Sequence, residues 1–536
     1  MSDKSRIWLL RGVSWLMLLF AIGWTTLYIF KGFGNPQDPC YWLYKYRTLE
    51  AGWLSIGTIL VGGAWVRLFG PELIGLRVLA WLCVVVAIGL PYCCLLSRDE
   101  RRANLHWLML GYALMCYGAF QEFSPGTLTV PLLSLLWVLL VLYRRREQSP
   151  WLAIAIGVVS ALAVFARFPN ILVVPIVLVA MVLRQGRLTP IRRWTDLLWM
   201  LLACAITDAL LYGVGYQLIV PTYADPAMNS HHFGAMFTLL WEKGAMMVGM
   251  LLFWGGLMGV GYVASHRLPE RWGRWREIVP GIAAGLIVGY YITFVPVMTQ
   301  WYNFDVTYMV SAFCLLLALW SRQPALLWGV AVLVVASLGT DTGWLKLFPA
   351  VLCLLPVAAV HLSPEWRRYL WPLALGFAIT VMVRFHMNSI GSGNMQYADT
   401  QSTISPYKGI YVRAEECQWM EQVVTDCDSL SVQGPVWVVG REMHRIRQLT
   451  GCHAAYYNEF WSNIFDGVYT KKYRELIERD HPIVICSFAP GFKTKPQYKD
   501  GHSALEDMLR EEGYSQIDRT RYKYIIYLPP HDTEIQ

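Results

Sequence analysis

The sequence predicts a polytopic α-helical membrane protein with a soluble α/β domain at its C-terminal end. Apolar residues make up 56% of the 536 residues and charged residues only 15%, against about 25% charged residues in an ordinary globular chain. Long apolar runs recur up to residue 386, and charged residues with shorter apolar runs return after it. So few charges cannot cover a soluble surface, which excludes a soluble enzyme, and so apolar a composition excludes a disordered chain.

The apolar runs predict about 13 membrane spans, since about 20 apolar residues cross a bilayer. The first run, Ile7 to Phe30, follows Lys4 and Arg6 and has no small-residue cleavage site. We therefore expect an uncleaved first helix with a cytoplasmic N-terminus. An odd number of spans puts the two chain ends on opposite sides. The later runs lie at residues 75–96, 105–120, 127–143, 151–166, 170–184, 196–220, 244–264, 277–298, 306–320, 324–339, 347–361 and 369–386.

Arginine clusters support this alternation, because cytoplasmic connections of membrane proteins are rich in Lys and Arg. Every second connection is basic, and the others are poor in arginine and rich in aromatic and polar residues. The net charge of +8 thus indicates topology and anionic membrane lipids as partners, and no nucleic acid. The basic connections contain Arg98, Arg101 and Arg102; Arg144, Arg145 and Arg146; Arg184, Arg187, Arg192 and Arg193; Arg267, Arg271, Arg274 and Arg276; Arg322; and Arg367 and Arg368.

One apolar segment, Trp53–Phe69, breaks the alternation if it is counted as a span, because every later connection would change sides. It also contains Gly57, Gly62 and Gly63. We predict a juxtamembrane helix inside a long first outer loop, residues 31–74.

Two groups of helical glycines repeat at a spacing of four residues. They are Gly281, Gly285 and Gly289 in one span and Gly255 and Gly259 in another. Small residues at this spacing allow helix backbones to approach closely, so we predict tight helix packing at both.

The composition divides the chain into a transmembrane domain, residues 1–386, and a soluble domain, residues 387–536. In the second part, helices predicted at 415–427, 469–479 and 503–512 alternate with strands at 435–439, 482–488 and 523–528. This alternation predicts a small α/β domain with a largely parallel sheet. Ser503 and Glu506 form a capping-box pattern, and Gly513 suits the residue just past that helix. The span count puts this domain outside the cytoplasm, where an oxidising compartment favours disulfides; Cys427–Cys452 is the preferred pair.

Acidic residues near the outer helix ends are the first candidates for chemistry. Asp38 follows the first span, Glu122 the third and Asp305 the ninth, each among aromatic residues. Carboxylates gathered in an outer cavity can bind a divalent metal cation or act as a general base. His231 and His232, in the outer loop 223–233, are candidates to complete such a metal site. Asp208 lies within the seventh span, where an acid indicates a functional position.

Several motifs in residues 7–185 resemble the GT-C superfamily of polyprenyl-phosphate-sugar-dependent glycosyltransferases, above all the protein O-mannosyltransferase and aminoarabinose-transferase branch. Those enzymes have an acidic residue after the first helix, juxtamembrane helices in the loop that follows, and a second acidic position in the next outer loop. The matching residues here are Asp38, Tyr41 and Trp42, Arg47, Gly52, Leu68 to Gly70, Leu76 and Arg77, Glu122, and Arg167 before Phe168 and Pro169.

The resemblance implies an inverting transferase that moves a sugar from a polyprenyl-phosphate donor to an acceptor on the outer face of a bacterial inner membrane. The acceptor is an unknown glycan, lipid or protein. Asp38 is then the catalytic base, in a reaction with an oxocarbenium-like transition state. Candidates for the donor phosphate are Arg77, Arg167, Lys45 and Arg47, since the arginine fork suits phosphate. Glu122, Asp305, His231 and His232 are candidates for a metal or the sugar, and Tyr41 and Asp208 for lining the groove.

Two other classes of function remain open. A lipid-linked saccharide flippase or polysaccharide exporter performs no chemistry, and such transporters show internal repeats and interrupted helices, which the sequence lacks. A membrane assembly protein whose outer domain recruits a partner has no need of Asp38. Replacement of Asp38 therefore separates the enzyme from both alternatives.

Overall fold

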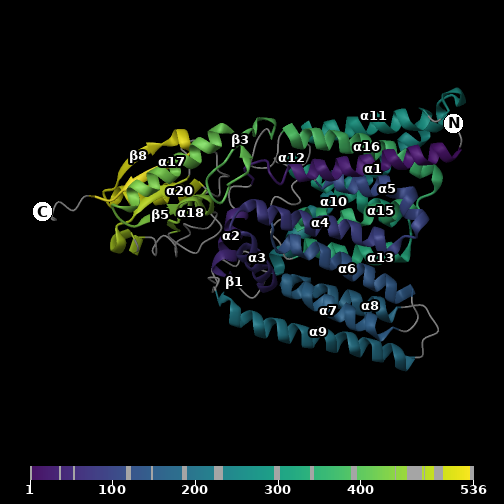
Figure 1. Ribbon diagram of the computed structural model, residues 1–536, viewed down its shortest axis with the longest axis horizontal. Coiled ribbons are helices and arrows are strands. Elements are labelled where there is room, and N and C mark those ends of the chain that lie inside the picture. The colour runs from purple at the N-terminus through teal and green to yellow at the C-terminus, as the bar shows by residue number, and fades with distance from the viewer. Residues whose placement is uncertain are drawn as a thin grey trace.

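The computed structural model has a helical bundle joined to a five-stranded sheet (Figure 1). The N-terminus lies at the end of the bundle far from the sheet, and the last strands lie at the opposite end of the molecule. The described residues are 3–34, 38–51, 55–115, 122–145, 149–183, 190–221, 233–273, 275–294, 302–338, 343–387, 395–440, 442–454, 474–475, 477–487 and 499–530.

Helices of the bundle overlap each range in which the sequence predicts a span. Four of them, within α4, α6, α9 and α10, are long and apolar enough to cross a membrane. The chain is thus a membrane protein, while the count of 13 spans stays a prediction. The helices are α1 (Asp3–Leu27), α4 (Leu73–Leu95), α5 (Arg98–Leu114), α6 (Pro125–Arg145), α7 (Pro150–Ala166), α8 (Val173–Val182), α9 (Pro190–Leu218), α10 (Phe233–Arg267), α11 (Trp275–Phe294), α12 (Tyr302–Trp320), α13 (Pro324–Leu333), α14 (Phe348–Val351), α15 (Leu355–Ala358) and α16 (Pro364–Met387).

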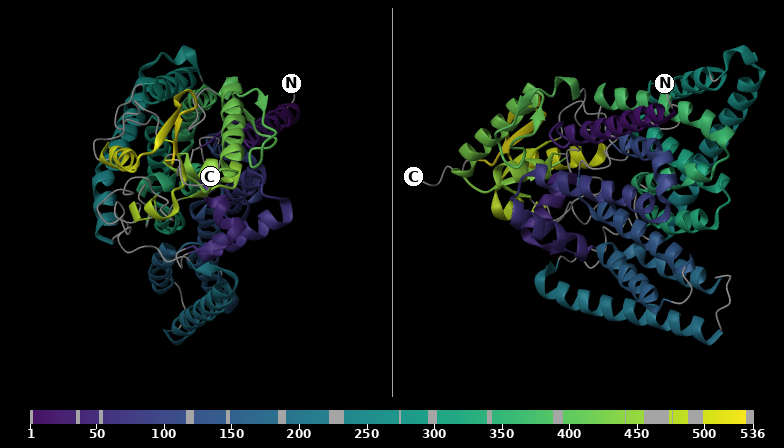
Figure 2. Two further views of the ribbon diagram at one scale, coloured as in Figure 1. Left: turned by 90° about the vertical axis from the view of Figure 1, so that its left-hand side faces the viewer. Right: turned by 45° about the vertical axis from the view of Figure 1, so that its right-hand side comes forward.

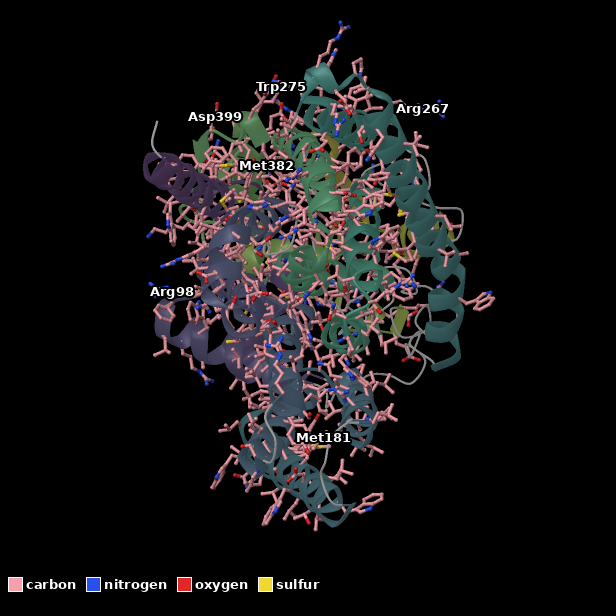
Figure 3. All side chains as sticks on the ribbon, turned by 90° about the vertical axis from the view of Figure 1, so that its right-hand side faces the viewer. Arg98, Met181, Arg267, Trp275, Met382 and Asp399 are labelled. Atoms are coloured by element: carbon pink, nitrogen blue, oxygen red, sulfur yellow. The ribbon has the colours of Figure 1, made fainter. Side chains whose placement is uncertain are left out.

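Basic connections gather at the end of the bundle that faces away from the sheet. Figure 3 views the molecule from this end and labels Arg98 and Arg267, from two of the arginine clusters. Arg98 begins α5 and Arg267 ends α10. Which end of the bundle faces the cytoplasm stays a prediction from the basic connections.

The glycine repeat of α11 packs against α16 as predicted. A side chain at Gly281 would come within 3.0 Å of the Cβ of Pro372, and one at Gly285 would collide with the carbonyl of Leu373. The prediction for Gly255 and Gly259 was wrong, because a side chain at either would meet no atom within 4 Å. These two glycines lie on a face of α10 that meets no described side chain, although Trp254 beside them donates to the carbonyl of Met309 in α12. The spacing alone therefore does not predict a helix contact.

The first outer loop contains two helices, α2 (Asp38–Thr48) and α3 (Ile56–Phe69). The sequence predicts α3, whereas α2 was missed. With 14 residues, α3 is about 21 Å long and does not reach across a hydrocarbon core of about 30 Å. Gly62 lies so close to the ring of Tyr46 that a side chain there would collide with it, and α3 thereby packs on α2.

A group formed by α7, α8 and α9 projects from one side of the bundle (Figure 2). The first outer loop is joined to this group by a short parallel pair of strands, β1 (Glu50–Ala51) and β2 (Val220–Pro221). Gly57 of α3 also lies against Phe165 of α7. The base of the first loop therefore rests on the outer ends of α7 and α9.

The C-terminal part has a mixed sheet, and the prediction of a largely parallel sheet was wrong. Its strand order is β6-β5-β7-β9-β8, with β5 parallel to β6 and β7, and β9 antiparallel to β7 and β8. A tight connection from β8 to β9 replaces the helical crossover that a parallel strand requires. The elements are β5 (Val436–Val439), β6 (His453–Ala454), β7 (Ile483–Cys486), β8 (Ser515–Arg519), β9 (Tyr524–Leu528), α17 (Ala414–Ser431), α18 (Met443–Thr450) and α20 (Lys499–Glu511).

Two further expectations for this part have mixed outcomes. Gly513 follows α20 with φ of 77°, as expected past a helix end. The capping box at Ser503 is wrong, because α20 begins at Lys499 and Ser503 lies inside it. The helix predicted at 469–479 falls largely outside the described residues.

The described cysteines are free thiols, and Cys116 lies outside the described residues. Cys427 and Cys452 are nevertheless neighbours, since a hydrogen bond joins their thiols. Cys427 and Cys452, the predicted disulfide pair, are therefore in contact as two thiols and form no disulfide.

Candidate active site

The short helix α2 carries four of the predicted site residues, Asp38, Tyr41, Lys45 and Arg47. Asp38 is its first residue and Pro39 the second, a sequence that suits a helix start because the carboxylate complements the helix dipole and proline lacks an N–H. Lys45 and Arg47 lie in its last turn, where cations are favoured. Asp38 is half-buried, and Lys45 is 6% exposed.

One face of α2 forms a polar and aromatic cluster with the C-terminal domain. The ammonium of Lys45 lies 5.5 Å from the ring centre of Tyr41, one helical turn away. The ring of Tyr41 packs edge-on against His444 of α18, with 5.2 Å between ring centres. His444 is 4% exposed, and the sequence gives no local signal for its place beside α2.

Glu122 lies near Tyr46 of α2 and forms an ion pair that the sequence did not predict. Its carboxylate is 3.5 Å from the ammonium of Lys346, and the two side chains are 18% and 37% exposed. Lys346 belongs to the short 3₁₀ helix Gly343–Leu347. Tyr46 of α2 donates a hydrogen bond of 2.8 Å to the carbonyl of Phe123. Burial raises the pKa of Tyr46 well above its usual range, and the Glu122 carboxylate raises it further.

Lys346 is therefore a site residue that sequence reasoning missed. A usable signal existed, since this lysine stands alone in an apolar stretch, Trp344 to Phe348, of an outer connection. A lone cation in such a stretch is expected to pair with an anion or to extend to the membrane–water interface.

The two buried arginines proposed for the donor phosphate instead bind backbone carbonyls. Arg77 donates to the carbonyls of Ile29, Lys31 and Gly32 at 3.3, 3.2 and 2.9 Å, and so holds the segment that leaves α1. Arg167 donates to Ala336 at 3.0 Å and also to Leu338. Both side chains are at most 5% exposed, and both stabilise the backbone around the site.

The remaining predicted residues lie at the edge of this cluster, apart from it, or outside the described residues. Arg47 is exposed and donates to the side chain of Gln448 at 3.1 Å. Asp208 accepts a hydrogen bond of 3.7 Å from the thiol of Cys204, one turn earlier in α9. The backbone of Asp305 lies in the first turn of α12, but its side chain is outside the described part, as are His231 and His232.

The described residues do not fit a metal site. No three side chains of His, Cys, Asp or Glu gather there in a way that could hold an ion, whereas a divalent cation in a protein takes several oxygen or nitrogen ligands. No step of the chemistry below is therefore assigned to a metal.

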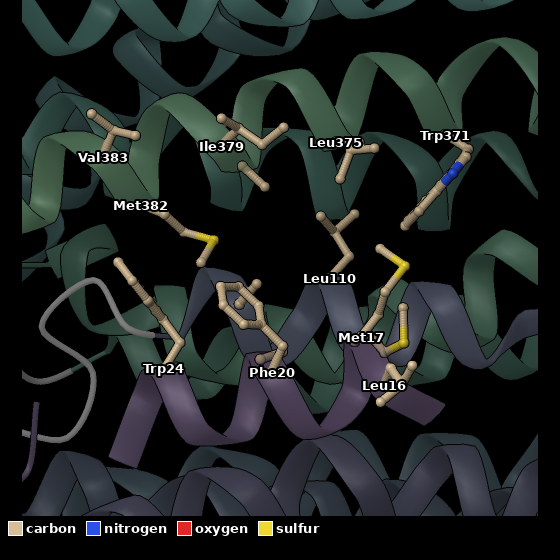
Figure 4. Close-up of a pocket in the computed structure, with 14 residues that line it drawn as sticks. Leu16, Met17, Phe20, Trp24, Leu110, Trp371, Leu375, Ile379, Met382 and Val383 are labelled. Carbon is tan, nitrogen blue, oxygen red and sulfur yellow. The ribbon is translucent and has the colours of Figure 1, made fainter. Parts of the chain in front are cut away.

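A separate pocket of about 510 Å³ lies among the bundle helices (Figure 4). Residues of α1, α5 and α16 line it, among them Phe20, Trp24, Leu110, Trp371 and Met382. None of the predicted polar residues reaches this pocket. Its apolar lining matches hydrocarbon and not a sugar or a phosphate.

Comparison with solved structures identifies the fold. ArnT from Cupriavidus metallidurans bound to undecaprenyl phosphate is similar to this chain with a TM-score of 0.50 and 13% sequence identity, over 98% of each chain. The chain therefore has the fold of the GT-C glycosyltransferases. ArnT from the same organism in the apo state matches with a TM-score of 0.48 and 13% identity, over 96% of this chain and 97% of that one.

A third structure, the Archaeoglobus fulgidus oligosaccharyltransferase complex with Zn and sulfate, matches with a TM-score of 0.44 and 12% identity, over 96% of this chain and 73% of that one. No family model and no curated protein matches the sequence.

Proposed function

We propose that the protein is an inverting glycosyltransferase that moves a sugar from a polyprenyl-phosphate donor to an acceptor on the outer face of the membrane. The observation that carries this proposal is the GT-C fold over nearly the whole chain, together with an acidic residue at the start of the first-loop helix. The match to a structure bound to undecaprenyl phosphate supports a lipid-linked donor.

The reaction requires a base, and Asp38 is the proposed one. The acceptor hydroxyl attacks the anomeric carbon from the face opposite the phosphate. A new C–O bond forms, the bond to the phosphate oxygen breaks, and the hydroxyl proton passes to Asp38. Attack from the opposite face inverts the configuration, and polyprenyl phosphate leaves as an anion.

The leaving phosphate requires cations, and Lys45 with Lys346 are the proposed ones. Arg77 and Arg167 are occupied by backbone carbonyls, so their free donors are few. Lys346 is partly exposed and bound to Glu122 over 3.5 Å, a pair that phosphate can replace because charged hydrogen bonds to phosphate are strong. Glu122, once released, can accept hydrogen bonds from the sugar.

Turnover of a polyprenyl-phosphate sugar to free polyprenyl phosphate tests this proposal. Detergent-purified protein is incubated with the donor and an acceptor extract, and the lipid products are measured by mass spectrometry. We expect Asp38→Asn to bind the donor with unchanged affinity and to lose about 10²- to 10⁴-fold in rate, the usual contribution of a general base. Lys346→Gln should weaken donor binding, and Lys346→Arg should restore it.

Asp99→Asn is the matched control, since Asp99 is 94% exposed at the start of α5, far from α2. Its turnover should equal that of the wild type. Equal turnover by wild type and Asp38→Asn contradicts the assignment of the base. Movement of the donor across vesicle membranes without release of its sugar would instead identify a flippase.

A further inference from the structure

The helix α18 of the C-terminal domain lies along the first-loop helix α2. His444 packs on Tyr41 with 5.2 Å between ring centres, and the guanidinium of Arg447 lies 3.6 Å from the ring centre of Tyr44. Gln448 accepts a hydrogen bond from Arg47. These contacts advance along both helices in the same direction. α18 is thus a neighbour of α2 over most of its length.

Arg445, on the same helix, points into the junction and is 4% exposed. Its guanidinium lies 3.7 Å from the ring centre of Phe33. It donates to the hydroxyl of Tyr407 at 2.9 Å and to the carbonyl of Gly34 at 3.4 Å. Arg445 also donates a hydrogen bond of 2.7 Å to the carboxylate of Glu442, a residue of the same domain.

These contacts involve residues on either side of Asp38 in the chain. Gly34 lies four residues before Asp38, and Cys40 two residues after it. The thiol of Cys40 is hydrogen-bonded to the hydroxyl of Tyr407 at 3.4 Å. One guanidinium thus binds the carbonyl of Gly34 before the proposed base and, through the hydroxyl of Tyr407, the side chain of Cys40 after it.

Burial of a charge is costly unless its hydrogen bonds are made. Within its own domain Arg445 contacts Glu442, Tyr407 and the ring of Trp419. Gly34 and Phe33, its other partners, belong to the transmembrane part. If Arg445 stabilised the C-terminal domain alone, its contacts with Phe33 and Gly34 would have no function. The planar guanidinium, which donates in several directions at once, suits a clamp between two domains.

We propose that Arg445 is a positioning residue that holds Asp38 in place, so that the C-terminal domain is part of the frame of the active site. The effect of this clamp on turnover rests on the proposed function. Its effect on structure does not, because the thiol of Cys40 reports on the clamp without any substrate.

The test uses full-length protein with Arg445→Met, Arg445→Lys and Tyr407→Phe. Cys40 is fully buried and burial raises its pKa to about 11, so maleimide should label it slowly in the wild type. We expect Arg445→Met to raise the labelling rate of Cys40 by at least 10-fold, read by peptide mass spectrometry. Arg445→Lys and Tyr407→Phe each keep part of the clamp and should raise it less.

Turnover and donor binding are then measured on the same variants. Arg445→Met should reduce turnover by at least 10-fold while the Kd for the donor changes less than 3-fold, and Arg445→Lys should recover part of the rate. Arg474→Met is the control, since Arg474 forms an exposed ion pair with Glu511 on the same domain, and it should behave as the wild type. If Arg445→Met does not fold, Tyr407→Phe, which keeps the ring, takes its place.

Unchanged labelling of Cys40 in all three variants overturns the clamp. Faster labelling with unchanged turnover overturns the positioning role, because the segment then moves without consequence for the rate. If the wild type shows no turnover at all, the proposed function fails, and the labelling of Cys40 still decides whether Arg445 joins the two domains.

Discussion

At the scale of single residues, the thiols of Cys427 and Cys452 show how one hydrogen bond changes the chemistry of a side chain. Cys427 lies on α17 and is 1% exposed, and Cys452 follows α18 and is partly exposed. The hydrogen bond from Cys427 lowers the pKa of Cys452 to about 6, and the same contact raises the pKa of Cys427. The shared hydrogen bond thus favours the ionised form of Cys452 over that of Cys427.

This pair predicts the pH dependence of alkylation. In reduced protein the iodoacetamide reaction of Cys452 should rise through pH about 6 and stay flat above pH 7, because the thiolate is the nucleophile. Cys427→Ala removes the donor, so the midpoint should move up toward the ordinary thiol value of about 8.5. The pH midpoint of the reaction is compared, and not its maximal rate, because a less basic thiolate is also a weaker nucleophile. The same midpoint in both proteins contradicts the hydrogen bond.

The sequence draws attention to acidic and basic candidates alike, but it does not predict the partners of the basic ones. Asp38 and Glu122 stand out because a carboxylate beside an apolar run is uncommon. Arg77 and Arg167 were candidates to bind the donor phosphate, yet they donate to the backbone carbonyls of Gly32 and Ala336. Which carbonyls lie near a guanidinium depends on how the helices pack, and no local pattern records it.

At the scale of elements, the packing of α11 on α16 depends on glycine. Gly285 lies against the backbone of Leu373 and Phe377, and Gly289 against the side chain of Thr380. Close approach of this kind lets helices pack in a membrane without a hydrophobic driving force between them. The contact is therefore sensitive to a single added side chain.

Gly285→Leu should destabilise the protein, by about 1–3 kcal/mol or more, because the new side chain has to push two helices apart. A lower thermal midpoint in detergent, read by intrinsic fluorescence, is the expected result. Gly255→Leu on α10 is the control, since nothing lies within 4 Å of a side chain at that position. Equal midpoints for the two variants would falsify the role given to Gly285.

Elements differ in how strongly the sequence predicts them. Long apolar runs predict the bundle helices, since the bilayer demands them. The helix α2 was missed because its eleven residues form no apolar run, although Asp38 with Pro39 is a helix-start pattern. The strand β8 was missed because it lies at the edge of the sheet and most of its residues are exposed, so its apolar alternation is weak.

At the scale of the whole molecule, the sequence predicts the two domains but not their junction. The change in composition near residue 386 predicts the boundary. The contact of α18 with α2 joins residues about 400 positions apart, as between Gln448 and Arg47, and only tertiary packing brings them together. The span count and the basic connections predict that this junction lies outside the cytoplasm, and this side stays a prediction.

Reporter fusions test the proposed topology. Alkaline phosphatase is active only outside the cytoplasm, so fusions after Leu49 and after Pro71 should both be active, because α3 between them is too short to cross. Fusions after Arg102 and after Arg267 should be inactive. A change in activity between Leu49 and Pro71 means that α3 crosses the membrane, and it reverses every later connection.

The dependence of α2 on α18 also has a consequence for the order of synthesis. Asp38 is made early, whereas Arg445 follows about 400 residues later, which at about 5–20 residues per second means about 20–80 seconds. During this time the first-loop helix lacks the guanidinium that binds the carbonyl of Gly34, four residues before Asp38. A nascent or truncated chain therefore contains the proposed base but not its frame, and only a finished chain is ready to act.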